Sequence, residues 1–204
     1  MKMLSVTKNL KNLVFFIILF LILPDQAFCK TKTTKTRKAK QKETKIEKLE
    51  KREKLENIFS FIAATETEKQ IPKGLLKAVI RQESSFDTKA YLGGSYGLGQ
   101  ITLGTAKTYC DDIHSYQSLY EYTTNITCAG EFLKVLLDKY NSKYYALSAY
   151  NIGTPFICNG KTYQRNLGRH KIENLSPCSV KEKGRVSNEK YVAGVMGHWK
   201  RYKI

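Results

Sequence analysis

The stretch "VIRQESSFDTKAYLGGSYGLGQIT", Val79–Thr102, runs from a helical pattern into a glycine-rich segment, and the rest of the fold must be built around it. Leu75, Val79 and Glu83 are spaced four residues apart, so they share one face of the helix. The apolar part of this face must point into a core, which places Glu83 where the core meets a cleft. Burial and the negative end of the helix would both raise the pKa of its carboxyl group, as a general acid requires.

The glycines that follow Glu83 favour this interpretation. The segment "GGSYGLGQ", Gly93–Gln100, has little side-chain bulk, so a ligand could approach the backbone closely. Gln100 adds a hydrogen-bond donor and acceptor. The alternatives are a flexible loop and an exposed glutamate that pairs with Arg81 or Lys89. The segment matches neither glycine pattern of nucleotide-binding loops, so nucleotide binding is not expected.

The first 29 residues have the pattern of a secretory signal peptide. Lys2, Lys8 and Lys11 precede an apolar run of eleven residues, Leu13–Leu23. A membrane-spanning helix needs about 20 apolar residues, so this run is too short. We expect cleavage after Cys29 and export to the periplasm. The alternatives are lipid attachment at Cys29 and an uncleaved signal that anchors the protein in the inner membrane.

The cysteines agree with export. The chain has five, and loss of Cys29 leaves an even set in an oxidising compartment: Cys110, Cys128, Cys158 and Cys178. Four cysteines allow three disulfide pairings. We expect the sequential pairs, Cys110–Cys128 and Cys158–Cys178, because each closes a short local loop. Free buried thiols are the alternative.

Residues 30–54 form a basic segment of low complexity. Residues 30–57 contain twelve Lys and Arg against five Glu, and the whole chain has a formal net charge of +17. This segment cannot bury enough apolar surface to fold alone, so its first half is expected to be disordered and its second half, from Glu43, helical. We interpret it as a solvated tether. The alternative is electrostatic attraction to anionic membrane or wall polymers; it has no aromatic residues for base stacking, and no specific nucleic acid is expected.

Residues 55–204 are predicted to form one mainly α domain. Apolar residues recur at helical spacing in five segments, and the polar stretch 158–186 interrupts them as a small irregular or hairpin excursion held by a disulfide. His114, His170 and His198 are scattered without ligand spacing, so no metal site is expected. The expected helices are residues 55–66, 71–84, 128–140, 143–152 and 188–201.

Four motifs follow one another along the predicted domain: "ESSFDTKA" at Glu83–Ala90, "GSYGLGQ" at Gly94–Gln100, "NITCAGEFL" at Asn125–Leu133 and "AYNIG" at Ala149–Gly153. Taken together and in this order, they resemble the lytic transglycosylases of the soluble-transglycosylase type, whose domain is related to goose-type lysozyme. The resemblance covers about Leu55–Trp199.

The resemblance implies a lysozyme-like helical domain with a substrate cleft, no cofactor, and Glu83 as the single catalytic acid. Tyr191 matches a tyrosine of the closing helix beside the cleft, although a core position explains it equally well. The further substrate-binding residues that it implies are Ser84, Ser95, Gln100, Tyr150 and Asn151.

The implied substrate is the glycan strand of peptidoglycan. The family cleaves the bond between N-acetylmuramic acid and N-acetylglucosamine without water and leaves a 1,6-anhydromuramic acid end. The alternatives are a lysozyme-like hydrolase, a non-catalytic protein that binds peptidoglycan during assembly, and a basic nucleic-acid binder. Small exported relatives often serve a secretion or conjugation apparatus, which is the protein partner that the resemblance implies.

This chain departs from the family pattern in three places. The loop after Ala90 is shorter by one residue, and Gly99 replaces a common methionine, which we expect to remove bulk beside the groove. The stretch Cys158–Cys178 is longer than in many relatives and is expected to cap one end of the cleft.

Overall fold

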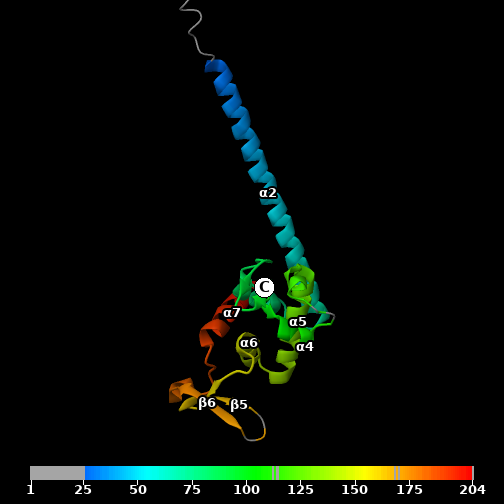
Figure 1. Ribbon diagram of the computed structural model, residues 1–204. Coiled ribbons are helices and arrows are strands. Elements are labelled where there is room, and N and C mark those ends of the chain that lie inside the picture. Colours follow the sequence, from blue (N-terminus) through cyan, green and yellow to red (C-terminus); the bar gives the residue numbers. More distant parts are fainter. Residues whose placement is uncertain (1–25, 112, 114, 168, 170, 204) are drawn as a thin grey trace, which may run out of the picture. The chain divides into compact units, whose positions relative to one another are not determined.

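The computed structural model describes residues 26–111, 113, 115–167, 169 and 171–203 (Figure 1). The chain divides into two compact units, Met1–Glu53 and Lys54–Ile204. The described part of the first unit belongs to helix α2 (Gln26–Glu68), which continues into the second unit. Most of the predicted signal peptide lies outside the described residues.

Helix α2 is longer than expected. It begins at Gln26 and not at Glu43, so the prediction of a disordered first half for the basic segment is wrong. Residues 26–68 contain neither glycine nor proline and are rich in Lys, Glu, Gln and Ala, which favour helix. Among the described residues, no helix combines the length and the apolar character needed to cross a membrane.

The second unit is mainly α, as predicted. Helices α3, α5, α6 and α7 match expected segments, whereas α4 and the 3-10 turn η1 were not expected. Helix α3 begins after Gly74, which adopts a left-handed conformation, so Pro72 precedes the helix instead of lying in its first turn. The bounds are α3 (Leu75–Ser84), α4 (Leu103–Tyr109), η1 (Tyr116–Tyr120), α5 (Tyr122–Tyr140), α6 (Lys143–Ile152), η2 (Val180–Glu182) and α7 (Glu189–Tyr202).

A buried carboxylate holds the first turn of α3. Glu66, near the end of α2, accepts hydrogen bonds from the backbone N–H of Gly74 at 2.7 Å and of Lys77 at 3.1 Å. These donors would otherwise be unsatisfied at a helix start. At the same end, the indole of Trp199 on α7 donates to the carbonyl oxygen of Lys73 at 2.9 Å. The helix that carries Glu83 is therefore fixed at its far end by two other helices.

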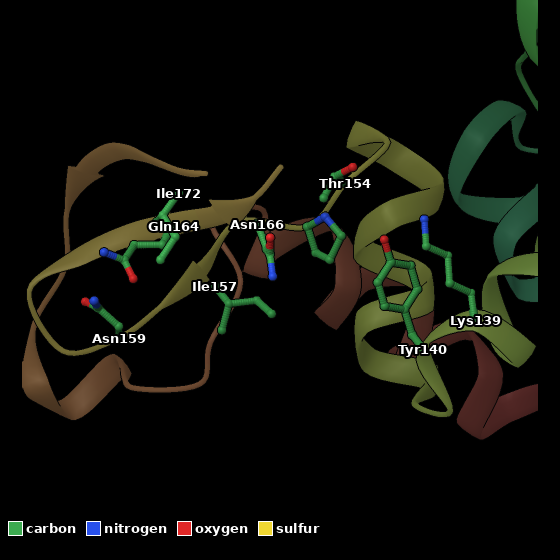
Figure 2. A pocket seen from close by; sticks show the side chains of 9 residues that line it. Lys139, Tyr140, Thr154, Ile157, Asn159, Gln164, Asn166 and Ile172 are labelled. Atoms are coloured by element: carbon green, nitrogen blue, oxygen red, sulfur yellow. The ribbon is translucent and has the colours of Figure 1, made fainter. Parts of the chain in front are cut away.

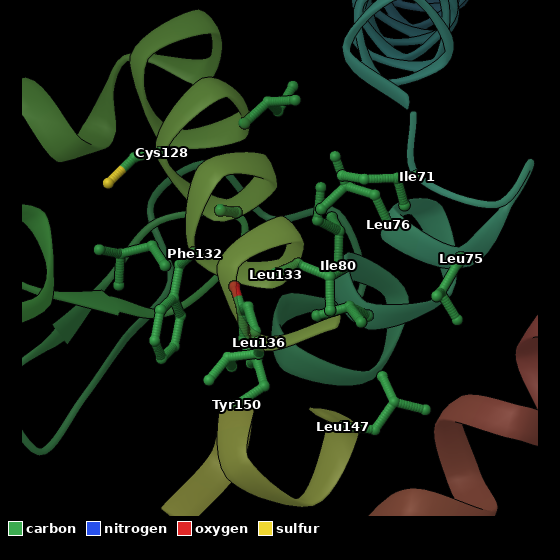
Figure 3. Packing of buried hydrophobic residues seen from close by; sticks show 14 of the residues in the cluster. Ile71, Leu75, Leu76, Ile80, Cys128, Phe132, Leu133, Leu136, Leu147 and Tyr150 are labelled. Atoms are coloured by element: carbon green, nitrogen blue, oxygen red, sulfur yellow. The ribbon is translucent and has the colours of Figure 1, made fainter. Parts of the chain in front are cut away.

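The core lies where α3, α5 and α6 pack together (Figure 3). Leu76 and Ile80 of α3 and Leu133 of α5 are fully buried. Full burial of such a side chain stabilises the fold by about 1.5–3 kcal/mol. The buried stripe of α3 includes Leu75 and Val79, the two residues predicted to share a face with Glu83.

Two small antiparallel sheets complete the unit. The first, β1 (Tyr91–Leu92), β2 (Ser95–Tyr96) and β3 (Ile101–Thr102), was not expected; it follows α3 directly. The second, β4 (Ile157–Cys158), β5 (Thr162–Asn166) and β6 (Ile172–Pro177), confirms the predicted hairpin excursion. Its β5–β6 hairpin extends beyond α6 (Figure 1).

Both predicted disulfides are confirmed. Cys110–Cys128 joins the end of α4 to α5. Cys158–Cys178 joins β4 to the residue that follows β6 and so closes the second sheet. Tyr145 of α6 ties this region to the helices, because its hydroxyl donates to the carbonyl oxygen of Gly184 at 3.1 Å.

Candidate active site

Glu83 lies in the last turn of α3, where the buried stripe ends. Its side chain is half-buried, and the hydroxyl of Tyr191 on α7 donates to Oε1 at 2.6 Å. Burial raises the pKa of the Glu83 carboxyl above its ordinary value, and the Tyr191 hydrogen bond opposes part of this rise. The other carboxyl oxygen, Oε2, has no hydrogen-bond partner among the described residues. Glu83 is thus a fixed carboxyl group that favours the protonated state and keeps one oxygen free.

The alternative of a surface ion pair at Glu83 is wrong. The Arg81 guanidinium stands over the ring of Phe86, with 5.8 Å to the ring centroid, and the Lys89 ammonium stands over Tyr120 at 5.3 Å. Neither cation pairs with the carboxylate. Neither cation therefore offsets the rise that burial causes in the pKa of Glu83.

The turn after Glu83 is held by Ser84. Two consecutive residues without glycine's freedom, Ser85 and Phe86, have positive φ angles of 52° and 69°. Such conformations cost about 1–3 kcal/mol each. The Ser84 hydroxyl donates to the carbonyl oxygen of Ile80 at 3.2 Å and accepts from the Phe86 N–H at 3.2 Å. Ser84 thus holds the turn that ends α3, and its contact with a substrate stays a prediction.

Tyr150 connects the glycine-rich segment to the site. It is buried on α6, and its hydroxyl donates to the carbonyl oxygen of Gly99 at 2.9 Å. Burial raises the pKa of Tyr150 well above its ordinary value, and the nearby Glu83 carboxylate raises it further. Tyr150 is thus a neutral hydrogen-bond donor that lies near Glu83 and positions the backbone of the loop.

Asn125 is the organiser of this loop that the residue-level prediction missed. It is fully buried in α5; its Oδ1 accepts from the Gly99 N–H at 2.7 Å, and its Nδ2 donates to the carbonyl oxygens of Tyr96 at 2.8 Å and Leu119 at 2.7 Å. One side chain therefore fixes three backbone groups, two in the loop and one in η1. Its place in the quoted "NITCAGEFL" motif was the available signal.

The glycines of the loop serve packing and turn formation. A Cβ at Gly97 would lie 2.3 Å from the carbonyl oxygen of Leu119, and a Cβ at Gly99 would lie 2.7 Å from the Cβ of Ala129. Gly93 and Gly94 form the two-residue β1–β2 turn, both with positive φ. The expectation that Gly99 removes bulk beside a groove is therefore wrong, because this position faces α5.

Helices α6 and α7 are joined beside the site by Asn188. Its Oδ1 accepts from the Ser148 hydroxyl at 2.6 Å, and its Nδ2 donates to Oδ1 of Asn151 at 2.9 Å. Asn188 lies three residues before Tyr191, so the same junction places Asn151 and the partner of Glu83. Asn151 is exposed, and none of the described residues accepts a hydrogen bond from its Nδ2, so this group can donate to a ligand.

Of the two remaining predicted residues, Ser95 lies in β2 and Gln100 lies in the turn between β2 and β3. Ser95 pairs with Leu92 and Thr102 in β2 and is half-buried. Gln100 has a positive φ of 50°, and its Nε2 donates to the carbonyl oxygens of Gly97 at 2.9 Å and Ala90 at 3.2 Å. The Gln100 amide group therefore braces the loop, and only its Oε1 is left to meet a ligand.

Residues 60–173 match the Transglycosylase SLT domain family, which is more than half of the chain. The chain belongs to this family. A solved structure of the lytic transglycosylase Slt from Pseudomonas aeruginosa, an inactive mutant, is 25% identical with a TM-score of 0.43. The match covers 46% of this chain and 16% of that one.

The SLT domain match ends before α7. Tyr191, the hydrogen-bond partner of Glu83, therefore lies outside the matched residues 60–173, as does Asn188. Glu83 lies within the matched residues 60–173. The side chain that orients Glu83 is identified by the structure of this chain.

Proposed function

We propose that this chain cleaves peptidoglycan glycan strands without water, with Glu83 as the single general acid and base. The observation that carries the proposal is the half-buried Glu83, whose pKa is raised by burial and whose Oε1 is held by Tyr191. A glutamic acid that remains protonated nearer neutral pH can donate a proton to a leaving oxygen. Membership in the SLT domain family supports peptidoglycan as the substrate.

The proposed reaction conserves every atom of the substrate. Glu83 donates its proton from Oε2 to the oxygen between N-acetylmuramic acid and N-acetylglucosamine, and the bond from C1 to that oxygen breaks. The acetamido oxygen of the muramic residue stabilises the positive charge at C1. The C6 hydroxyl oxygen then bonds to C1, and the Glu83 carboxylate takes the hydroxyl proton. The products are a 1,6-anhydromuramic acid end and a free hydroxyl, and Glu83 is protonated again.

The surroundings of Glu83 favour this route over hydrolysis. Hydrolases of glycosides commonly use two carboxylates on either side of the bond. Burial raises the pKa of Glu83, the Tyr191 hydrogen bond opposes part of this rise, and no other described carboxylate contributes to the shift. Asp87, four residues further on, is exposed, and its Oδ1 accepts from the Lys89 N–H at 2.9 Å. A single carboxylate fits internal attack by the substrate's own hydroxyl group.

The proposed substrate contacts come from two elements, α6 and the turn between β2 and β3. Asn151 offers its Nδ2 from the end of α6, and Gln100 offers its Oε1 from the loop after β2. Tyr150 acts indirectly, since its hydroxyl group holds the Gly99 carbonyl. Ser95 stays a predicted contact.

Export is the second part of the proposal. Two disulfides in the folded unit fit an oxidising compartment, and the N-terminal pattern predicts a signal peptide with cleavage after Cys29. We therefore place the protein in the periplasm, where peptidoglycan is accessible. Service to a secretion or conjugation apparatus stays a prediction of the resemblance, and co-purification from envelope extracts tests it.

Substitution of the acid tests the catalytic assignment. Glu83→Gln should abolish release of soluble muropeptides from purified peptidoglycan, because glutamine cannot donate the proton. Asp87→Asn is the matched control, since Asn keeps the Oδ1 that accepts from Lys89; it should keep near wild-type activity. Both variants should show the wild-type circular dichroism spectrum. Full activity of Glu83→Gln would remove Glu83 as the acid, and loss of activity in Asp87→Asn alone would indicate a second carboxylate.

A further inference from the structure

A cavity of about 530 Å³ lies between the end of α5, the turn after α6 and the β4–β6 sheet. Its volume is in the range of sites for small ligands. Figure 2 shows the sheet residues on one side and Tyr140 and Lys139 on the other, with Thr154 between them. The lining residues are Lys139, Tyr140, Thr154, Pro155, Ile157, Asn159, Gln164, Asn166 and Ile172.

The sheet side of the cavity presents carboxamide groups. Gln164 and Asn166 are two residues apart in β5, so they share one face of the sheet, and Arg165 pairs with Glu173 on the other face. Nε2 of Gln164 donates to Asn174 at 2.6 Å, which leaves the Gln164 Oε1 as an acceptor toward the cavity.

Asn159 complements this acceptor with a donor. Its Oδ1 accepts from the N–H groups of Lys161 at 3.1 Å and Thr162 at 3.2 Å. None of the described residues accepts a hydrogen bond from its Nδ2, which can therefore donate to a ligand. A ligand that carries both N–H and C=O groups, as an amide does, can use both contacts.

The helix side presents one cation and one aromatic ring. Lys139 is exposed, and its Nζ stands 5.3 Å from the centroid of the Tyr140 ring. No carboxylate among the described residues pairs with Lys139, and no acidic residue lines the cavity. A ligand with one negative charge would therefore gain a charge-assisted hydrogen bond without displacing an internal partner.

The position of the cavity connects it to the candidate active site. Thr154 and Pro155 follow the pair Tyr150 and Asn151 within five residues of the chain. The Cys158–Cys178 disulfide fixes the sheet that forms the opposite wall. The segment 150–155 therefore contributes residues both to the candidate active site and to the cavity.

We propose that the cavity binds the short peptide attached to the peptidoglycan strand, with a carboxylate of that peptide on Lys139 and its amide groups on Asn159 and Gln164. The inference rests on the proposed function for the identity of the substrate. An unsubstituted neutral glycan has no group for the Lys139 charge. A phosphate would meet only one cation, whereas phosphate sites typically collect several donors.

Titration of the wild-type protein with a peptide tests the site independently of catalysis. The probe is a synthetic tetrapeptide of stem-peptide composition with a free terminal carboxylate, compared with the same peptide ending in an amide. Nuclear magnetic resonance should show saturable shifts at the Asn159 and Gln164 side-chain amides. The amidated peptide should bind roughly tenfold more weakly, the effect of one charge-assisted hydrogen bond. Equal binding of both peptides, or shifts elsewhere only, would overturn the proposal.

Kinetics on two substrates separate this proposal from the proposed function. Lys139→Met should raise KM roughly tenfold for peptide-bearing strands, leave kcat unchanged, and leave cleavage of peptide-free strands unaffected. Lys134→Met is the matched control, because it removes the same charge from the same helix outside the cavity. Equal KM effects on both substrates would contradict the peptide site. An inactive wild type on both substrates would instead reject the catalytic function, while the peptide titration still reports on the cavity.

Discussion

Tyr191 contacts Glu83 across 108 residues of sequence, and this single hydrogen bond determines how the acid is presented. The hydroxyl donates to Oε1, which stabilises the carboxylate, while burial favours the protonated form. The net direction is a raised pKa. Tyr191 itself is held neutral, because burial and the Glu83 charge raise its pKa well above the ordinary value. Tyr191 thus orients the acid without competing for its proton.

Tyr191→Phe should shift the pH dependence of cleavage to higher pH. The acid must be protonated, so activity falls as pH rises through the pKa of Glu83. Loss of the hydroxyl removes a contact that favours the carboxylate, so this pKa rises further and the falling limb moves upward. The maximum rate should drop roughly tenfold, because the carboxyl group loses its orienting hydrogen bond.

A pH–rate profile of kcat measures both effects. Tyr163→Phe is the control, since Tyr163 is half-buried in β5 and contacts Glu182. Its profile should match the wild type. A falling limb that moves to lower pH in Tyr191→Phe would contradict the assigned role of the hydroxyl.

A site residue could be predicted when its contacts lie close to it in the sequence, and not when they lie far away. Glu83 was predictable because the stripe of α3 is local in sequence. The motif resemblance predicts that Ser84 and Gln100 contact the substrate, and the structure adds that their side chains also hold turns. Such roles depend on backbone carbonyls that only the folded chain brings within reach. Asn188 was missed for the same reason, since its partners lie on α6, 37 and 40 residues away.

At the scale of elements, the loop from β1 to β3 is fixed by contact with α5. Gly97 and Gly99 allow the backbone to reach Asn125 and Ala129 at distances that no Cβ would permit. The Asn125 and Tyr150 side chains then satisfy the backbone of the loop. The loop after Glu83 is therefore a packed element, and its glycines report on packing as well as on turn geometry.

Gly97→Ala should destabilise the protein by about 1–3 kcal/mol more than Gly93→Ala. Both residues have positive φ, at 68° and 55°, so the conformational cost of alanine is similar. Only the Gly97 Cβ would meet backbone, the carbonyl oxygen of Leu119 at 2.3 Å, whereas nothing lies within 4 Å of a Cβ at Gly93. Urea unfolding of the two variants gives the difference. Equal free energies of unfolding would show that the loop does not pack on η1 and α5 as described.

Removal of the Cys158–Cys178 disulfide should lower the free energy of unfolding by about 3 kcal/mol, the value for a loop of this length. The variant is Cys158→Ser with Cys178→Ser, and urea unfolding without reductant measures the loss. The wild type with reductant should lose more, because it also loses Cys110–Cys128. An unchanged midpoint in the double variant would show that the disulfide does not stabilise the β4–β6 sheet.

Helices and disulfides were largely predictable, whereas short strands were not. The helices follow from periodic apolar residues, as in α5 and α6, and the sequential disulfides from short loops. The strands β1–β3 have two residues each and carry no alternating pattern, so pairing across Gly93 and Gly94 defines them. The basic segment, residues 30–54, has few apolar residues, which predicts disorder, but its Lys, Glu and Gln residues favour helix.

At the scale of the whole molecule, the residues that match the family do not include every residue of the candidate active site. The match ends at residue 173, yet α7 supplies Tyr191 and packs along α3. A version of the chain that ends there would keep Glu83 and lose the side chain that orients it. The catalytic unit that we propose is therefore Lys54–Ile204, the second compact unit.

Digestion of purified peptidoglycan in heavy-oxygen water, followed by mass analysis of the soluble products, tests the central claim most directly. The account predicts 1,6-anhydromuramic acid ends, each lighter by one water than a reducing end, with no heavy oxygen incorporated. Glu83→Gln should release no such products under the same conditions. Reducing ends that carry heavy oxygen would contradict the account, because they would show that water, and not the C6 hydroxyl of the substrate, attacks C1.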